Sequence, residues 1–271
     1  MYYSGVISTS ELKNRGFSQK DISRAIELGR FARPDADGQA VRAIRAGGQL
    51  GCLSGLAARK LWVPRFQDLH VVYGQGSRPA PRAGIQFHPT DQPRQTQAVW
   101  PLLDCLQQVA HRHDAETALV TFESALNLRL ATLTDLHLLL STLPKRTQRI
   151  GAFLGRAESG SETRVRYFLQ RRNFSVRAQI SIPGVGRVDL LVGDRLIVEC
   201  DSDAHHRSKE AHQEDRRRDL AARDLGLDVV RLTYHQIWLD WPATQLSLLR
   251  LLRTRRHHYR HKNGYTARRV P

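Results

Sequence analysis

Apolar and polar residues alternate in two short runs in the second half of the chain, residues 187–192 and residues 196–201. This alternation predicts two β-strands joined by a turn, because successive side chains of a strand point to opposite faces. The residues expected to share the apolar faces are Val188, Leu190 and Val192 on the first strand and Leu196, Val198 and Cys200 on the second. Three carboxylates, Asp189, Glu199 and Asp201, alternate with them, so the pairing register decides whether these acids meet.

The length of the turn sets that register. A two-residue turn would place Asp189 opposite Val198 and would mix carboxylates with apolar residues on one face. A three-residue turn over residues 193–195 leaves one face apolar, and a slip of one residue would exchange the faces. We therefore predict the odd register, with Asp189 and Glu199 roughly 5 Å apart at Cβ.

Carboxylates this close repel one another unless a cation lies between them. Oxygen ligands on rigid strands suit Mg²⁺ or Mn²⁺. We expect Asp189 and Glu199 to be metal ligands, and Asp201 to be either a third ligand or an acid beside the ligands. Hydrolysis of a phosphodiester requires an activated water, a neutralised phosphate and a stabilised leaving oxygen, most of which one or two divalent ions supply.

A helix and a further strand are predicted before this hairpin. Ser159 or Ser161 can cap the helix, and Glu162 shares the stripe of Val165, Phe168 and Leu169, so that it points inward. Glu162 either favours the helix dipole or lies over the sheet as a further metal or water ligand. In residues 175–182 the expected core residues are Val176, Ala178, Ile180 and Ile182. Gln179 would then lie on the acidic face, where it orients a water or a phosphate, or is simply exposed.

A charged helix over about residues 208–225 and a strand over residues 227–233 are predicted after the hairpin. A helical crossover makes this strand parallel to an earlier one. Asp215 and Arg218 share a helix face, where Arg218 grips the scissile phosphate or the two form a salt bridge. Arg216 and Arg217 contact backbone phosphates or are solvated, and Arg231 is a further substrate-binding candidate whose register the sequence leaves open.

The loop between the hairpin and this helix contains His205 and His206. His205 is a candidate base or proton donor near neutral pH, with His206 as the second choice. A structural hydrogen bond in the loop is the alternative for either residue.

The order helix, three strands, helix, strand, with acids at Glu162, Asp189, Glu199 and Asp201, is similar to the PD-(D/E)xK nuclease core. Residues 158–240 more closely resemble the very-short-patch-repair-like endonuclease domain. The residues that carry this resemblance are Glu199-x-Asp201-x-x-x-His205, Asp215-x-x-Arg218, Gly226 and Val229-Val230-Arg231. The resemblance implies a restriction-endonuclease-like αβββαβ core that cleaves DNA with Mg²⁺ or Mn²⁺. Two positions depart from the pattern, because Asp201 replaces the usual lysine and Ser202 replaces a glycine.

Residues 5–46 predict a compact helical module. Ser10 and Ser18 can cap two short helices separated by Gly16, and residues 29–44 suggest a wing. The candidate groove-facing residues of this winged helix-turn-helix are Ser18, Gln19, Lys20, Ser23 and Arg24. A helical protein-interaction module is the alternative. The run Gly5 to Leu12, with Gly16, Ile22, Gly29, Phe31 and Arg33, resembles the N-terminal domain of AbiEi-type antitoxins.

Residues 49–150 predict a mainly helical connecting domain with one strand, residues 69–73, and a role in protein interaction or homodimer formation. The predicted helices are residues 54–61, 102–110, 115–128 and 133–143. His111 and His113 are expected to be solvated. A domain boundary is expected in the basic segment 145–155, before the endonuclease-like domain of residues 156–245.

The net charge of the chain indicates what kind of partner it binds. The 271 residues include 42 Lys and Arg against 26 Asp and Glu, giving +16, with a pI near 10.6. A polyanion is the expected partner, and nucleic acid such as DNA is the leading candidate. A membrane surface, or a role of the charge in solubility alone, is the alternative. The basic tail, residues 250–271, is either a phosphate-binding arm or a disordered solubilising segment.

The three cysteines, Cys52, Cys105 and Cys200, show no C-x-x-C spacing, so neither a disulfide framework nor a typical structural zinc site is expected. We expect a cytoplasmic protein, nucleoid-associated if bacterial, because its thiols are few and it has neither a signal-peptide core nor an apolar run of about 18 residues.

These patterns predict an α/β chain, α+β overall, with a winged-helix module (residues 1–48), the helical middle domain, the endonuclease-like domain and the basic tail. The leading hypothesis is a metal-dependent DNA endonuclease. The alternative is a DNA-binding regulator or antitoxin-like protein whose nuclease fold is inactive. A third hypothesis is a zinc-binding nucleic-acid module that uses Cys200, His205 and His206, which the hairpin disfavours because Cys200 falls on the core face.

Overall fold

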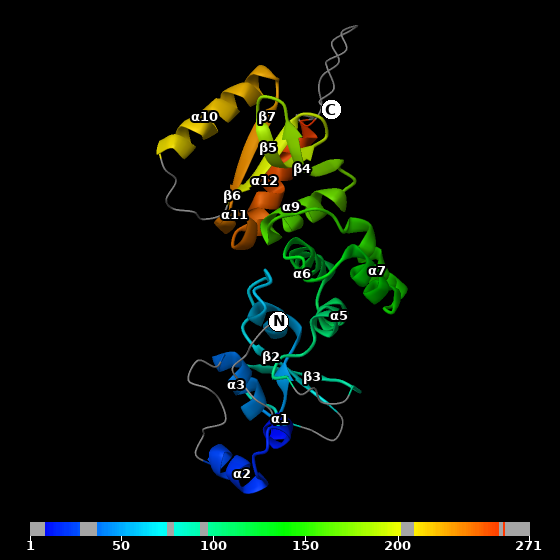
Figure 1. Ribbon diagram of the computed structural model, residues 1–271. Helices are drawn as coiled ribbons and strands as arrows, with labels where there is room; N and C mark the ends of the chain where they lie inside the picture. The colour runs from blue at the N-terminus through cyan, green and yellow to red at the C-terminus, as the bar shows by residue number, and fades with distance from the viewer. Residues whose placement is uncertain are drawn as a thin grey trace. The chain divides into compact units, whose positions relative to one another are not determined.

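The computed structural model describes residues 9–27, 37–74, 79–92, 97–201, 209–254 and 257. The chain divides into two compact units, Met1–Gly151 and Ala152–Pro271 (Figure 1). Each unit contains helices and an open sheet, of three strands in the first and four in the second, so the mixed α/β class is confirmed. The finer division of the first unit into two domains stays a prediction. Among the described residues, no helix has both the length and the apolar character needed to cross a membrane.

The second unit has the predicted order of helix, three strands, helix and strand. Its elements are α9 (Gly160–Gln170), β4 (Val176–Ile182), β5 (Gly186–Val192), β6 (Leu196–Asp201), α10 (Lys209–Asp224), β7 (Asp228–Thr233), α11 (Tyr234–Trp238) and α12 (Trp241–Arg253). The first four residues of the predicted basic tail therefore belong to α12. Apart from Thr254 and His257, the rest of that tail lies outside the described residues.

The strands form one sheet in the order β4-β5-β6-β7. Strands β4, β5 and β6 are antiparallel neighbours, and β7 is parallel to β6, as the crossover through α10 predicts. Helix α10 covers one face, with Ala222 in a core with Leu191 and Ile197. Helices α9, α11 and α12 cover the other face (Figure 1).

The pairing of β5 with β6 confirms the odd register. Leu190 lies opposite Val198 and Val192 lies opposite Leu196, so the connection is a three-residue turn over residues 193–195. Continued by one residue, the same register places Asp189 across from Glu199. Gly193, the first turn residue, has φ +64° and lies against the backbone of His257, whose carbonyl accepts a hydrogen bond from the Asp194 N–H at 3.0 Å.

The predicted alternation of faces is wrong at one point. Ala178 of β4 was expected to share a face with Ile180, and Leu190 of β5 with Val188. Instead, Ala178 and Leu190 pack in the core beneath α9, whereas Ile180 and Val188 pack in the core beneath α10. The change occurs at Gln179, which has φ +53° and interrupts the ladder between β4 and β5 without shifting its register. A non-glycine residue in the left-handed region is a local distortion that a two-residue period cannot reveal.

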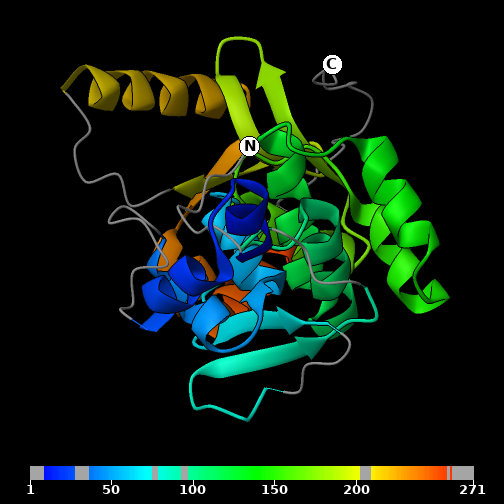
Figure 2. The same cartoon turned by 60° about the horizontal axis from the view of Figure 1, so that its bottom comes forward.

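The first unit contains more strand than predicted. Its elements are α1 (Thr9–Asn14), α2 (Gln19–Glu27), α3 (Gly38–Arg45), β1 (Gln49–Leu50), α4 (Cys52–Ala58), β2 (Leu69–Tyr73), β3 (Ile85–Pro89), α5 (Leu102–Arg112), α6 (Ala115–Asn127), α7 (Leu133–Ser141) and α8 (Lys145–Gln148), followed by a 3₁₀ turn (Arg149–Phe153). Strand β3 runs parallel to β2, beside it in Figure 2, whereas only β2 was predicted. Pro89 ends β3, which is tolerated because β3 is an edge strand.

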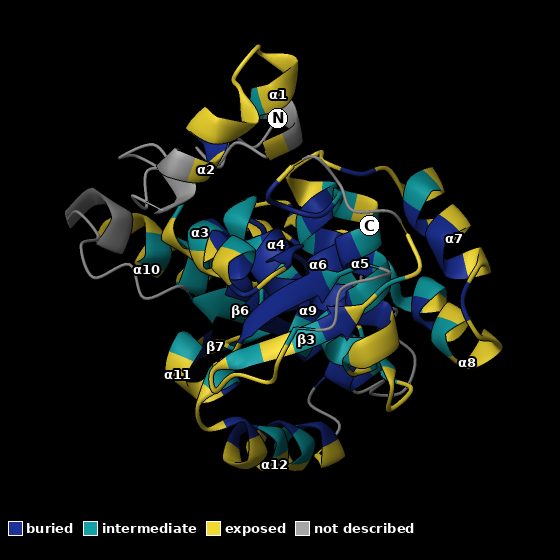
Figure 3. Cartoon of the chain, turned by 90° about the horizontal axis from the view of Figure 1, so that it is seen from below, coloured by how far each residue is buried: buried dark blue, intermediate teal, exposed yellow. Residues whose placement is uncertain are grey.

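The helical start of this unit is partly as predicted. Ser18 precedes α2, where its hydroxyl accepts a hydrogen bond from the Asp21 N–H at 3.2 Å, and Ile22 is buried. The predicted wing is wrong for its second half, because Asp37 caps a helix there, α3. The first half, residues 29–36, lies outside the described residues. Figure 3 shows α1 as largely exposed and α4 as largely buried.

Gly193→Ala tests the turn that sets the β5 to β6 register. An added Cβ would lie 2.2 Å from the His257 carbonyl oxygen, and φ +64° already disfavours alanine. We expect a loss of about 1–2 kcal/mol from the backbone conformation and about 1–3 kcal/mol more from the clash, measured by urea unfolding.

Gly184→Ala is the matched control, because Gly184 has φ +83° but nothing within 4 Å of the added Cβ. Equal losses of stability in the two variants would contradict the role assigned to the close approach at Gly193.

Candidate functional site

Four predicted site residues come together in the second unit, one from each of four neighbouring elements. They are Glu162 from α9, Gln179 from β4, Asp189 from β5 and Glu199 from β6. These residues are at least 10 positions apart in the sequence, but hydrogen bonds connect them in the order Glu162, Gln179, Asp189, Glu199. Gln179 Nε2 donates to Glu162 Oε2 at 2.7 Å and to Asp189 Oδ1 at 3.4 Å.

Asp189 occupies the place where β5 and β6 diverge. The last described ladder pair on this side is Leu190 with Val198. Beyond it, Asp189 Oδ2 accepts a hydrogen bond from the Cys200 N–H at 2.8 Å, and the Asp189 N–H approaches Glu199 Oε2 at 3.4 Å. The side chain thus takes the role that a backbone carbonyl has in a continuous ladder, which fixes the carboxylate at the fork.

Glu162 is buried at the first turn of α9. Ser159 is the N-cap of this helix, and its hydroxyl donates to Glu162 Oε1 at 2.8 Å, while the Glu158 N–H donates to Oε2 at 2.9 Å. Burial raises the pKa of Glu162, and these donors oppose the rise. Because protein donors already occupy both oxygens, the geometry favours Glu162 as a positioning residue for Gln179 over a direct metal ligand.

Gln179 links the two acids through its amide nitrogen, and its amide oxygen is left over. Within the described part of the chain, Gln179 Oε1 is buried and has no hydrogen-bond partner. A buried acceptor without a donor costs about 1–3 kcal/mol. A bound water or cation beside Asp189 would satisfy this oxygen, which is consistent with the orienting role that the sequence suggested.

The pKa of Glu199 is raised well above the ordinary value of a glutamate. Burial, and then the negative charge of Asp189, raise the pKa of Glu199 to about 7, although the nearby Arg218 guanidinium lowers it. Arg218 NH2 lies 3.2 Å from Glu199 Oε1. Glu199 is therefore only partly ionised at neutral pH, and a divalent cation beside it would favour its ionised form.

Arg218 also holds α10 against the β4 to β5 hairpin. Its guanidinium donates to the carbonyl oxygens of Val185 at 2.9 Å and Arg187 at 2.6 Å. These partners, together with Glu199, fix its position beside the acids. Its proposed contact with a scissile phosphate stays a prediction.

The register of Arg231, open from sequence, is now known. Arg231 of β7 pairs with Glu199 of the parallel strand β6, and its guanidinium binds Asp219 of α10. Asp219 raises the pKa of Arg231 most, and Asp201 and Asp215 add to the rise. Asp201 and Asp215 therefore lie near Arg231, and Asp201 is on the Glu199 side of β6 by strand alternation.

The remaining predicted residues divide between surface and undescribed positions. Arg216 and Arg217 are exposed on α10, where Arg217 binds Glu214. Gln19 and Lys20 are exposed on α2; Arg24 belongs to α2, but its side chain is not among those described. His205 and His206 lie outside the described residues, so their catalytic roles stay predictions.

The donor set at the fork suits a hard divalent cation. Asp189 and Glu199 offer carboxylate oxygens, Asp201 ends the same strand as Glu199, and Gln179 Oε1 is an unmatched buried acceptor. Oxygen donors of this kind are the ligands of Mg²⁺ and Mn²⁺. Cys200 packs against the core on the opposite face of β6, which disfavours the zinc hypothesis built on this cysteine.

The pKa of Glu199 predicts how stability depends on pH in chelator-treated protein. The folded-state pKa, about 7, exceeds the ordinary value of 4.5, so the folded state binds more protons between these limits. Stability therefore falls as pH rises through this window, by up to about 3 kcal/mol. Glu199→Gln should remove most of this fall in urea unfolding measured at pH 5 and pH 8.

Glu158→Gln serves as the control, because Glu158 is exposed and pairs with Arg187. An unchanged pH dependence in Glu199→Gln would show that Glu199 is not the group responsible.

Comparison with known proteins adds no relative to this picture: neither a protein-family model nor a curated protein matches the chain.

Proposed function

We propose that this protein is a metal-dependent DNA endonuclease that hydrolyses phosphodiester bonds. The observation that carries the proposal is the contact of Asp189 with Glu199 at the point where β5 and β6 diverge, with the pKa of Glu199 raised to about 7. Two acids held together against their repulsion are typical of a site that binds a cation or transfers a proton. The αβββαβ order around them agrees with the nuclease core that the sequence resembles.

Asp189 and Glu199 would hold Mg²⁺ or Mn²⁺, with Asp201 as a third ligand or an adjacent acid. Such an ion supplies an activated water and neutralises charge on the phosphate. The chain's own contribution is orientation: Glu162 and Ser159 hold Gln179, which holds Asp189. Gln179 Oε1 would accept a hydrogen bond from the attacking water.

Proton transfer and phosphate binding fall to residues around these acids. Asp201 stands where the resembling family has a lysine, so we assign the proton-transfer role to His205. Arg218 and Arg231 would face the substrate phosphate from α10 and β7, with Asp215 supporting them. Both arginines are already held by carboxylates, which limits their movement before substrate binds.

DNA is the proposed substrate because the chain is strongly basic, with a net charge of +16. Exposed Arg216 and Arg217 on α10 would contact its backbone. Gln19, Lys20 and Arg24 on α2 would contribute a second, groove-facing contact from the helical module. In this proposal the protein works in the cytoplasm, where DNA is accessible and thiols stay reduced.

A second function is favoured by one contact and one sequence position. The ion pair of Arg218 with Glu199 partly neutralises the acids without any metal, and the position of the usual lysine is occupied by Asp201. Both features suit a DNA-binding regulator or antitoxin-like protein that keeps the nuclease fold without its activity. The two functions differ in whether bound DNA is cut.

Cleavage of supercoiled plasmid separates them. We expect cleavage with Mg²⁺ or Mn²⁺ and none with chelator. Asp189→Asn and Glu199→Gln should each lower the rate by about 100-fold or more, because each removes a carboxylate ligand of the cation that would stabilise the transition state. DNA affinity, measured by fluorescence anisotropy, should stay within about a factor of three, because phosphate contacts elsewhere supply it.

Glu158→Gln is the matched control, since it removes an exposed carboxylate from the same unit and should retain cleavage. Tight DNA binding without cleavage, under every divalent ion and DNA form, would reject the enzyme and support the regulator.

A further inference from the structure

A cluster of sulfur and nitrogen ligand atoms lies in the first unit and includes none of the residues to which a function is assigned above. It consists of Cys52 at the start of α4, His70 in β2, His88 in β3 and His113 just after α5. Ligand atoms of Cys52, His70 and His88 all lie within 4.8 Å of one another. His113 Nε2 lies 3.2 Å from Cys52 Sγ, and His70 Nδ1 lies 2.8 Å from His88 Nε2. We refer to these four residues as the Cys-His cluster.

The cluster is removed from water. Cys52, His70 and His88 are each at most 2% exposed, and His113 is half-buried, so the prediction that His113 is solvated is wrong. The parallel pairing of β2 with β3 brings the two strand histidines to diagonal positions on one face, with their rings stacked at 5.0 Å. Burying histidines with so few polar partners costs free energy of folding, unless a bound ligand satisfies their nitrogens.

The histidines are poised as neutral ligands. Burial lowers the pKa of His70 to about 3 and of His88 to about 4, and it raises the pKa of the Cys52 thiol to about 12. In the metal-free protein all three groups are therefore neutral. Their mutual hydrogen bond leaves His88 Nδ1 buried without a partner in the described part of the chain. The cluster therefore has more polar nitrogen atoms than its own hydrogen bonds satisfy.

The backbone around Cys52 is fixed in an uncommon conformation. Cys52 has φ +46°, and its N–H donates to Gln108 Oε1 at 2.9 Å. The preceding residue, Gly51, donates to the His70 carbonyl at 3.2 Å and leaves no room for a Cβ, which would lie 2.0 Å from a Val72 methyl. The His70 N–H in turn donates to the Ser54 hydroxyl. Non-glycine residues in this region of φ recur at functional sites, and here the strained residue carries the sulfur.

We propose that the Cys-His cluster binds one zinc ion as a closed structural site. Cys52, His70 and His88 supply three ligand atoms within 4.8 Å of one another, and His113, 3.2 Å from Cys52 Sγ, is the proposed fourth ligand. These are the donor types that zinc prefers in a four-coordinate site, and zinc would displace the proton of the Cys52 thiol. In a tetrahedral site the two coordinated nitrogens lie roughly 3.3 Å apart, so His70 and His88 need separate by only about 0.5 Å to admit the ion. A hard, oxygen-seeking ion such as Mg²⁺ does not fit this donor set.

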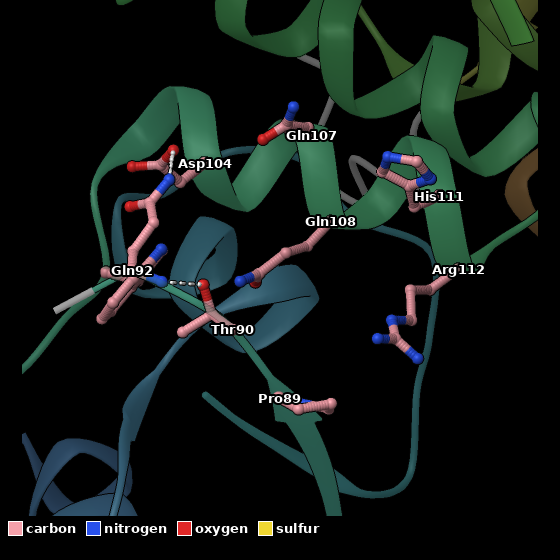
Figure 4. Close-up of a pocket in the computed structure, with 9 residues that line it drawn as sticks. Pro89, Thr90, Gln92, Asp104, Gln107, Gln108, His111 and Arg112 are labelled. Atoms are coloured by element: carbon pink, nitrogen blue, oxygen red, sulfur yellow. Dashed lines mark hydrogen bonds between the residues drawn. The ribbon is translucent and has the colours of Figure 1, made fainter. Parts of the chain in front are cut away.

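The surroundings support a structural role over a catalytic one. An open pocket of about 380 Å³ lies beside the cluster, lined by Gln108 and Arg112 of α5 and by Pro89, which follows His88 (Figure 4). Gln108 is also the residue that fixes the Cys52 backbone. None of the described residues that line this pocket is a proposed zinc ligand. An ion held by four protein ligands would have no open position for a substrate.

The proposed ion would crosslink parts of the chain that are far apart in sequence. Its ligands come from the β1 to α4 turn, two neighbouring strands and the end of α5. The three-stranded sheet is short, with only two residues in β1, so a metal crosslink would contribute directly to folding of the first unit. This proposal does not depend on the nuclease function.

Metal analysis of the full chain, purified without chelator, tests the proposal. We expect about one zinc per chain, lost in Cys52→Ser and in His88→Ala. Cys105→Ser, at a second buried cysteine, and His111→Ala, at an exposed histidine of α5, should keep it. Cobalt substitution should give a thiolate-to-cobalt charge-transfer band that Cys52→Ser abolishes and Cys105→Ser retains.

Wild-type protein provides a measurement that does not rely on variants that fold poorly. Chelator should lower the melting temperature, and Zn²⁺, but not Mg²⁺, should restore it. Protein that neither contains zinc nor takes up Zn²⁺ or Co²⁺, with an unchanged melting temperature, would establish a neutral hydrogen-bonded network instead. Full zinc retention in folded Cys52→Ser would place the ion elsewhere and would also overturn the proposal.

Discussion

The hydrogen bond from the Cys200 N–H to the Asp189 carboxylate is the contact on which the arrangement of the second unit depends. It satisfies a backbone donor where β5 and β6 separate, so the fork needs no further strand to close it. It also holds one carboxylate beside Glu199 in spite of their repulsion. Gln179 has a positive φ on the neighbouring strand β4, and its side-chain amide donates to both Glu162 and Asp189.

Charge at this fork is divided between two helices. From α10, Arg218 approaches Glu199 and also binds two carbonyls of the hairpin, so one guanidinium both offsets the acids and ties the helix to the sheet. From α9, Glu162 is held by a serine cap and reaches the acids through Gln179. Burial is the main cause of the raised pKa of Glu199 and the charge of Asp189 adds to it, whereas Arg218 opposes the rise. The site is therefore rigid in position but incomplete in charge, which is the condition in which a divalent cation binds with little rearrangement.

The sequence predicts what depends on periodicity and turn length, and misses what depends on a single dihedral angle or on distant parts of the chain. The β5 to β6 register followed from the three-residue turn, because one apolar face must stay apolar. The exchange of faces at Gln179 arises from one positive φ, which no pattern encodes. Strand β3 was missed because it is a short edge strand stabilised by β2. The Cys-His cluster was missed because no two of its donors are close in sequence, the two strand histidines being 18 residues apart.

The two candidate metal sites differ in the chemistry of their donors, and this difference keeps them independent. The fork of the second unit offers carboxylate and amide oxygens at a half-buried position, where a hydrated Mg²⁺ can keep several waters. The Cys-His cluster offers a cysteine sulfur and imidazoles at a buried position, where a bound ion would lose its water ligands. Among the described cysteines, Cys52 contributes to such a cluster, whereas Cys105 and Cys200 pack among apolar residues. Donor softness and burial therefore distinguish the two proposals, a structural zinc ion in the first unit and an exchangeable Mg²⁺ or Mn²⁺ in the second.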